Sequence, residues 1–293
     1  MVKPFTFSRL SVFVLLLAAV YAYAPVVRRL VRDWATDDNY SHGFFIVPLA
    51  LFFAWERRGR LAAAPREPAA LGLLVVVGSL GLLVAGTLGA ELFLTRISLI
   101  GTLAGAVLFL FGWTHLWILA FPLLFLLLMV PIPAIVFNQV AFPLQLIASR
   151  FGASALYACS IPVLREGNVI VLANTTLEVA EACSGIRSLV SLLTLAIVYG
   201  YFIDSRGWVR TVVALSAVPI AIIANGTRVA GTGVAAHWYG PEAAQGFFHT
   251  FSGWLVFGVA FAMMLALSSA VRWLAGPDRE KERSHEPEKE AVA

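Results

Sequence analysis

The stretch "AALGLLVVVGSLGLLVAGTLGA", residues 69–90, decides the fold class, because it holds no charged residue over its whole length. A helix needs about 20 mainly apolar residues to cross the hydrocarbon core of a bilayer. The whole chain of 293 residues follows the same pattern, with 60% hydrophobic residues, 13% charged residues and a mean hydropathy of +0.84. Soluble domains carry about 25% charged residues. The composition therefore predicts an all-α polytopic membrane protein and excludes a large soluble domain.

Eight segments are long and apolar enough to be predicted as transmembrane helices. They are residues 6–27, 43–55, 69–90, 95–113, 115–133, 183–203, 211–231 and 249–274. The first has the basic start of a signal peptide, but its apolar run is too long for one, so we expect a retained helix. We expect one integral membrane domain over residues 1–276 and a charged, disordered cytoplasmic tail over 277–293.

The placement of lysine and arginine predicts the orientation of the chain. With both termini on the cytoplasmic side, 13 of the 21 basic residues lie inside. The net charge of +4 is accounted for by this bias, so the sequence gives no reason to expect a nucleic-acid partner. Two cysteines are too few for a disulfide framework.

Residues 134–182, between the fifth and sixth spans, break the hydrophobic pattern. Residues 134–160 are apolar but interrupted by polar side chains and proline, which favours an amphipathic helix in the outer interface; whether it spans the membrane is left open. The alternating run that begins at Val169, followed by the turn-like residues 174–176, predicts a β-hairpin. A hairpin needs water or protein cover, so we expect it outside the bilayer, where it leads to Cys183.

Three polar residues on the last three predicted spans fall at the same outer depth. Cys183 opens the sixth span, Arg228 lies where the seventh ends, and His249 lies where the eighth begins. A helix N-terminus and Arg187, one turn further on, favour the thiolate form of Cys183. A histidine can take the thiol proton and return it to a leaving amine, and an arginine can stabilise a tetrahedral oxyanion. This combination predicts an acyl-transfer site.

Other interpretations of the same residues remain open. Cys183 is also explained as a small packing residue or as the partner of Cys159 in a disulfide. Arg228 is also explained as a snorkelling side chain, and His249 as an interfacial one.

Three blocks of sequence, "EACSGIRSL", "NGTRVAG" and "GFFHTFSGWLVF", resemble the exosortase family of bacterial membrane transpeptidases, as does "DDNYSHGFFIVPLALFFAW" near the N-terminus. The resemblance covers about residues 30 to 275. It implies a multi-pass enzyme of the bacterial inner membrane with its active site on the extracytoplasmic face. It also implies a catalytic set of Cys183, Arg228 and His249, with no metal or organic cofactor.

The partners that the resemblance implies are exported proteins and an acceptor. The exported proteins would end in a Pro-Glu-Pro (PEP-CTERM) motif, a transmembrane helix and a basic tail. The enzyme would cleave this sorting signal through a thioester and pass the protein to a glycan or lipid-linked acceptor in the context of exopolysaccharide export. Membrane lipids are expected around the spans.

Five further residues are candidates for substrate binding or support of the site. They are Arg187, Asn225, Glu181, His42 and Tyr40. Asn225 is expected either to orient Arg228 or to cap a break in the seventh span at Gly226, while Tyr40 and His42 would line a substrate groove or anchor the interface.

The main alternative function is a non-catalytic component of exopolysaccharide export that binds a polyprenyl lipid. The sequence has no His-Glu-x-x-His zinc motif and no Gly-x-Ser-x-Gly elbow, so other intramembrane hydrolases are not favoured. A protease that hydrolyses the thioester remains the closest competitor of a transpeptidase.

Overall fold

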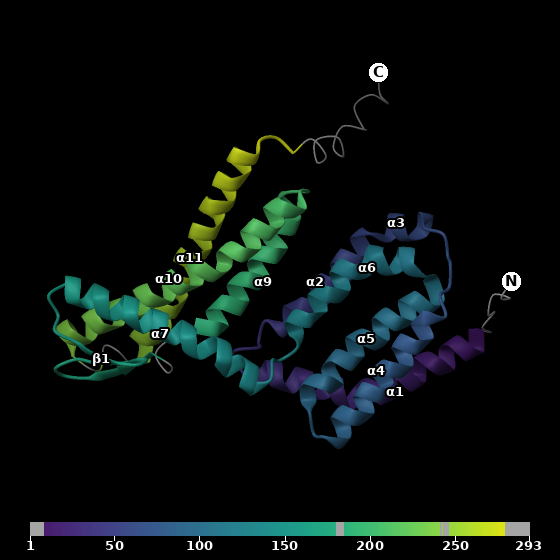
Figure 1. The fold of residues 1–293 in the computed structure, drawn as a ribbon, viewed down its shortest axis with the longest axis horizontal. Helices are drawn as coiled ribbons and strands as arrows, with labels where there is room; N and C mark the ends of the chain where they lie inside the picture. Colours follow the sequence, from purple (N-terminus) through teal and green to yellow (C-terminus); the bar gives the residue numbers. More distant parts are fainter. Residues whose placement is uncertain (1–8, 180–184, 241, 243–245, 279–293) are drawn as a thin grey trace. The chain divides into compact units, whose positions relative to one another are not determined.

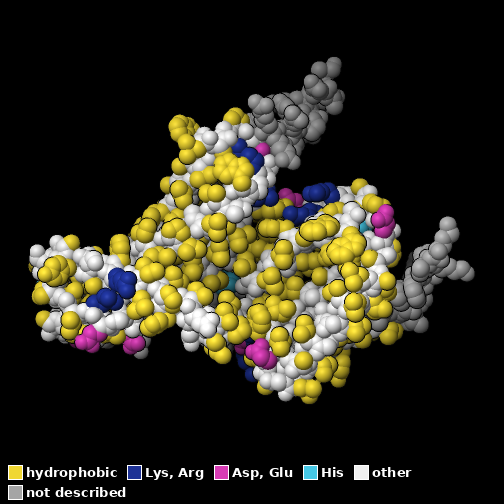
Figure 2. Space-filling model, viewed as in Figure 1, with side chains coloured by type: hydrophobic (Ala, Val, Ile, Leu, Met, Phe, Trp, Pro, Cys, Tyr) yellow, Lys and Arg dark blue, Asp and Glu magenta, His cyan; other side chains and the backbone are white. Residues whose placement is uncertain are grey.

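The computed structural model describes residues 9–179, 185–240, 242 and 246–278, apart from the side chains of 9–13, 15, 16, 185–187, 246–250 and 252. Helices dominate the described ranges (Figure 1). The chain divides into two compact units, Met1–Pro133 and Ala134–Ala293. Hydrophobic side chains cover most of the face visible in Figure 2, as expected for helices that meet lipid.

The first unit contains six α-helices and one 3₁₀-helix among its described residues. They are α1 (Arg9–Thr36), α2 (Gly43–Glu56), α3 (Arg58–Ala63), α4 (Leu71–Leu88), α5 (Leu92–Phe111), α6 (Trp113–Phe125) and η1 (Leu126–Met129). Small residues let α4 and α5 pack closely: a Cβ on Gly72 would lie 2.2 Å from the backbone nitrogen of Phe109, and one on Gly101 would lie 2.4 Å from Ser79 Oγ. Close approach through small residues is typical of helix pairs in membranes.

The second unit contains α7 (Ala134–Ala158), a small sheet, α9 (Gly185–Ile203), α10 (Gly207–Tyr239) and α11 (Gly246–Ala275). The sheet is an antiparallel meander of β1 (Leu164–Glu166), β2 (Val169–Val171) and β3 (Thr176–Glu178). Figure 1 shows the sheet beside α7 and the three long helices α9, α10 and α11 lying next to one another.

Helix α10 is the shared wall of two hydrophobic clusters in this unit. One cluster fills the space between α9, α10 and α11 and includes Leu192, Val213 and Met264. The other joins α7, the sheet and α10 through residues such as Leu156, Ile170 and Val229. Arg228 is adjacent in sequence to Val229, so the candidate site lies at the border between the two clusters.

All eight predicted transmembrane segments contain helix, but the count of eight spans remains a prediction. Four described helices are long and apolar enough to cross a membrane: Leu71–Leu88, Leu92–Phe111, Gly207–Tyr239 and Gly253–Ala275. The count is five if Trp113–Met129 and Ala134–Ala158 form one broken span. Gly43–Glu56 and Ser188–Ile203 are apolar but shorter. The chain is therefore a multi-pass membrane protein with four to five candidate spans in its described part.

The structure adds detail to two predictions about the second unit. The predicted hairpin exists as β2 and β3, but β1 adds a third strand, which Gly167 connects to β2 with a φ of +65°. Helix α10 continues past Arg228 to Tyr239 and is therefore longer than the predicted span of residues 211–231, while the position of Arg228 at the end of that span remains a prediction. Gly233, after Arg228, lies inside this helix and leaves room for Leu156 of α7, whose Cδ1 would lie 2.7 Å from a Cβ at position 233.

The start of the predicted tail is ordered by contacts with the loop between α9 and α10. The Asp278 carboxylate accepts hydrogen bonds from the backbone nitrogen and the hydroxyl of Ser205, both at 2.7 Å. The prediction of disorder for residues 279–293 lies outside the described residues.

Candidate active site between three membrane helices

The described part of the candidate site is a small cavity of about 10 Å³ enclosed by α9, α10 and α11. Its polar lining comes from Ser188 of α9 and from Asn225 and Arg228 of α10. Apolar residues complete the wall: Leu192, Ala221, Ala224, Val256, Phe257 and Ala260, together with Gly253. A volume of this size holds at most about one water molecule.

Asn225 and Arg228 lie three residues apart, so the helical repeat places them on the same face of α10. Asn225 is buried, with 9% of its surface exposed, and Arg228 is half-buried. Both line the cavity, and the role of Asn225 in orienting Arg228 remains a prediction.

Gly253 of α11 leaves the space in which the Arg228 guanidinium lies. A Cβ on Gly253 would lie 3.3 Å from Nη2 and 3.5 Å from Cζ of Arg228. Contacts of 3.3 Å are tighter than ordinary van der Waals packing, so the glycine leaves room that a larger residue would take. Position 249 lies one helical turn before Gly253 on α11, which places the backbone of His249 on the same side of the helix. The side chain of His249 is outside the described residues.

The third predicted catalytic residue, Cys183, lies outside the described residues, as does Glu181. Helix α9 begins at Gly185, two residues after Cys183, and its Ser188 lines the cavity. Arg187 belongs to the first turn of α9, but its side chain is outside the described residues. The cysteine at 159, considered as a disulfide partner, is a free and exposed thiol.

Small residues on α7 and α10 bring these two helices together beside the cavity. A Cβ on Gly226 would lie 2.4 Å from Cδ1 of Phe151, and one on Gly152 would lie 2.5 Å from Cγ1 of Val229. These glycines flank Arg228 on α10 and on the facing helix. The position of the arginine backbone therefore depends on the packing of α7.

Tyr40 and His42 belong to the first unit, where both contact the segment around η1. His42 Nε2 lies 3.0 Å from the backbone oxygen of Leu128, so this nitrogen carries the proton in the neutral ring. Burial lowers the pKa of His42, and the hydrogen bond to Leu128 opposes that effect. Burial also raises the pKa of Tyr40, whose hydroxyl lies 3.5 Å from the oxygen of Ile132. Their role in substrate binding remains a prediction.

Sequence reasoning missed Ser188 and Gly253 as parts of the site. Both lie in the quoted blocks, one residue after Arg187 and four residues after His249. The helical repeat was the available signal, since 249 and 253 share a face. Within the described ranges, no three His, Cys, Asp or Glu side chains gather as metal ligands would.

The fold and this site define a class: a multi-pass helical membrane protein with a buried polar cluster between three of its helices. The family model for transmembrane exosortase (EpsH type) matches residues 34–266, and the chain belongs to this family. A search of curated proteins and a search of solved structures gave no match.

Proposed function

We propose that the protein is a cysteine transpeptidase of the bacterial inner membrane that cleaves C-terminal sorting signals of exported proteins. Its substrates end in a Pro-Glu-Pro motif, a transmembrane helix and a basic tail. The site faces the extracytoplasmic side, and the acceptor is a glycan or a lipid-linked molecule of exopolysaccharide export.

One observation carries the proposal: three sequence blocks that are far apart in the chain contribute to one cavity. The block after Cys183 supplies Ser188, the Asn-Gly-Thr-Arg block supplies Asn225 and Arg228, and the block that contains His249 supplies Gly253. Membership of the exosortase family supports the same assignment.

The proposed reaction begins when His249 takes the proton of the Cys183 thiol. The thiolate attacks the carbonyl carbon of the scissile peptide bond and forms a tetrahedral oxyanion. Arg228 stabilises this oxyanion with its guanidinium group, and Asn225 positions Arg228. The C–N bond then breaks, His249 gives its proton to the leaving amine, and the substrate remains as a thioester on Cys183.

A second nucleophile completes the reaction by attacking the thioester carbonyl. His249 accepts the proton of that nucleophile, the C–S bond breaks, and Cys183 is released. An acceptor amine or hydroxyl gives transfer, and water gives hydrolysis. Arg187 favours the thiolate in both half-reactions because it adds positive charge one turn from Cys183.

The membrane raises the rate of the proposed reaction because it confines the substrate to the plane of the bilayer. A substrate that is tethered by its own transmembrane helix presents its juxtamembrane peptide at a constant depth, which raises its effective concentration. The sheet β1–β3 supports transfer over hydrolysis if it excludes water from the thioester. Deleting residues 165–180 in a folded protein should then increase the hydrolysed fraction, whereas an unchanged product ratio would remove this role.

The test is processing of a tagged protein that ends in a Pro-Glu-Pro signal, co-expressed with the enzyme. Cys183→Ala, Arg228→Gln and His249→Gln should each abolish the size shift of the substrate at equal enzyme abundance. Cys159→Ala is the matched control, because this cysteine is free and exposed and has no part in the mechanism. Processing by Cys183→Ala at the wild-type rate would exclude a thiol nucleophile.

The mass of the new C-terminus separates the two outcomes of the thioester. A free carboxylate indicates hydrolysis, and an added mass indicates transfer and identifies the class of acceptor. Processing by the wild type that ends only in free carboxylate would replace the transpeptidase by a protease with the same residues.

A further inference from the structure

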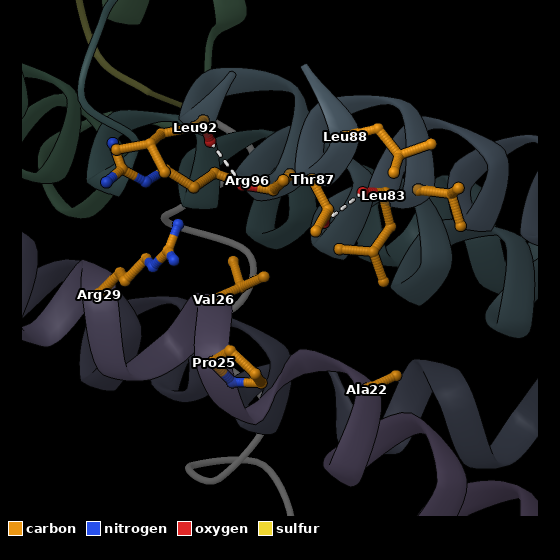
Figure 3. A pocket seen from close by; sticks show the side chains of 11 residues that line it. Ala22, Pro25, Val26, Arg29, Leu83, Thr87, Leu88, Leu92 and Arg96 are labelled. Carbon is orange, nitrogen blue, oxygen red and sulfur yellow. Dashed lines mark hydrogen bonds between the residues drawn. The ribbon is translucent and has the colours of Figure 1, made fainter. Parts of the chain in front are cut away.

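The first unit contains a larger cavity, of about 350 Å³, between α1 and the α4–α5 pair (Figure 3). Its volume lies within the range of small-molecule binding sites, about 300–1,000 Å³. None of its lining residues has a part in the proposed reaction. It therefore needs an explanation of its own.

The cavity exists because α1 is held to α5 at two points and leaves α4 uncovered. At one point the Tyr23 hydroxyl donates to the backbone oxygen of Ser98 at 3.1 Å and lies 2.7 Å from Thr102 Oγ1. At the other point Asp33 forms an ion pair with Arg96. The space between these helices is lined by apolar side chains such as Val26, Leu83 and Leu88.

The polar side chains on the cavity wall offer little to a polar ligand. The Thr87 hydroxyl donates to the backbone oxygen of Leu83 at 2.7 Å, and the Thr95 hydroxyl donates to that of Leu92 at 2.8 Å. Each hydroxyl hydrogen is therefore used within its own helix, and Figure 3 draws the bond between Thr87 and Leu83 as a dashed line. The body of the cavity suits a hydrocarbon chain.

Both charged residues of the lining are arginines, and their guanidinium groups point to the same end of the cavity (Figure 3). Arg96 is 4% exposed and is neutralised by Asp33. Arg29 is exposed and has no ion pair within the described ranges. One uncompensated cation therefore marks the end of an otherwise apolar cavity.

We propose that this cavity binds one anionic phospholipid of the surrounding membrane. The headgroup phosphate contacts Arg29, and one acyl chain lies along Val26, Leu83 and Leu88. An apolar wall with a cation at one end matches the two parts of a lipid, whereas a soluble anion would leave the apolar wall unused. The proposal does not depend on the catalytic proposal, because it concerns separate residues and a binding readout.

The test is thermal unfolding of the purified full-length protein in detergent with added dioleoylphosphatidylglycerol or dioleoylphosphatidylcholine. The anionic lipid should raise the melting temperature in a concentration-dependent manner, because a ligand of the folded state stabilises it. Arg29→Gln should weaken the apparent affinity for phosphatidylglycerol about fivefold, as expected for one basic residue near a lipid surface. Arg28→Gln is the matched control, since Arg28 is exposed but contacts the backbone oxygen of Ala24 and does not line the cavity.

A second variant tests the chain-binding part of the cavity. Ala22 lines the cavity, so Ala22→Phe should fill it and remove stabilisation by phosphatidylglycerol while Arg29 remains. Equal affinities of Arg29→Gln and Arg28→Gln would overturn the proposal, as would wild-type lipid affinity in Ala22→Phe. Stabilisation by inorganic phosphate equal to that by phosphatidylglycerol would also overturn it, because the acyl chain would then contribute nothing.

Discussion

The Arg228 guanidinium of α10 lies against Gly253 of α11, close enough that a Cβ on Gly253 would be 3.3 Å from Nη2. This contact links the block that carries the arginine to the block that carries His249. The two residues are 25 positions apart in the sequence and lie on adjacent helices. Because the neighbour is the end of a flexible side chain, a small substitution at 253 should move the guanidinium rather than unfold the protein.

Gly253→Ala should therefore reduce processing without reducing stability. The added methyl group shifts the guanidinium by a few tenths of an ångström, while alanine is favoured over glycine in a helix by about 1 kcal/mol. We expect activity to fall about tenfold, which corresponds to about 1.4 kcal/mol of transition-state stabilisation. Gly258→Ala is the matched control, since nothing lies within 4 Å of a Cβ at that position of the same helix. Processing rates and melting temperatures of both variants test this prediction. If Gly253→Ala and Gly258→Ala process the substrate at equal rates, the position of the guanidinium is unimportant.

Gly226→Ala should destabilise the protein by disturbing the contact between α7 and α10. Its Cβ would lie 2.4 Å from Cδ1 of Phe151 and 3.0 Å from Cβ of the same residue, so the ring or a helix must move. Overpacking of this kind costs about 1–3 kcal/mol. Gly231→Ala on the same helix meets nothing within 4 Å and serves as control. Thermal unfolding compares the two, and a melting temperature of Gly226→Ala at or above that of Gly231→Ala would contradict the tight packing.

The helices were predictable because long, mainly apolar runs have few alternatives in a membrane protein. Residues 69–90 and 183–203 correspond closely to α4 and to α9. Strand β1 was not predictable, since "LRE" at 164–166 offers one apolar residue and no alternation. The predicted span of residues 211–231 is shorter than α10, which runs from Gly207 to Tyr239, because hydropathy marks the apolar part of a helix and not its full length.

The catalytic candidates could be chosen from residue type and from predicted depth in the membrane. The residues that pack around them could not be chosen in this way. Asn225 and Arg228 share a face by spacing alone, so their joint placement at the cavity follows from the sequence. The role of Gly253 depends on which side chain of another helix lies opposite, and no spacing rule contains that information. The contact between Gly226 and Phe151 likewise could not be predicted from spacing in the sequence.

The stability of the protein should decrease as the pH falls below about 7, in part because of His42. Burial lowers the pKa of His42 in the folded state below its ordinary value of 6.5. At a pH between the folded and the unfolded pKa of His42, the unfolded state binds more protons than the folded state. The contribution of His42 to the free energy of unfolding is therefore full above the unfolded pKa and is lost as the pH falls through the folded pKa. His42→Gln keeps a donor near the Leu128 oxygen but does not titrate, and should flatten the dependence of melting temperature on pH between 7 and 5. The exposed His237, replaced by Gln, is the control; identical pH profiles for His42→Gln and the wild type would contradict the assignment.

Asp204→Asn should destabilise the second unit through the end of α11. The Asp204 side chain is 1% exposed and accepts hydrogen bonds from Nε and Nη2 of Arg206 at 2.9 and 2.7 Å, while Nη1 of Arg206 donates to the backbone oxygen of Ala275 at 2.7 Å. Losing the carboxylate leaves Arg206 without its ion-pair partner and loosens its hold on α11.

The pH dependence of this variant distinguishes loss of charge from a change of shape. The hydrogen bonds from Arg206 lower the pKa of Asp204 below its ordinary value of 3.8, so the contribution of the carboxylate is full above that value and is lost as the pH falls through the folded pKa. The difference in melting temperature between the wild type and Asp204→Asn should therefore be largest near neutral pH and shrink below pH of about 3.8. Ser205→Ala removes a hydrogen bond to Asp278 but keeps the ion pair, and should show no such convergence. If the difference in melting temperature between the wild type and Asp204→Asn stays constant down to acid pH, the shape of the Asp204 side chain, and not its charge, stabilises the C-terminal end of α11.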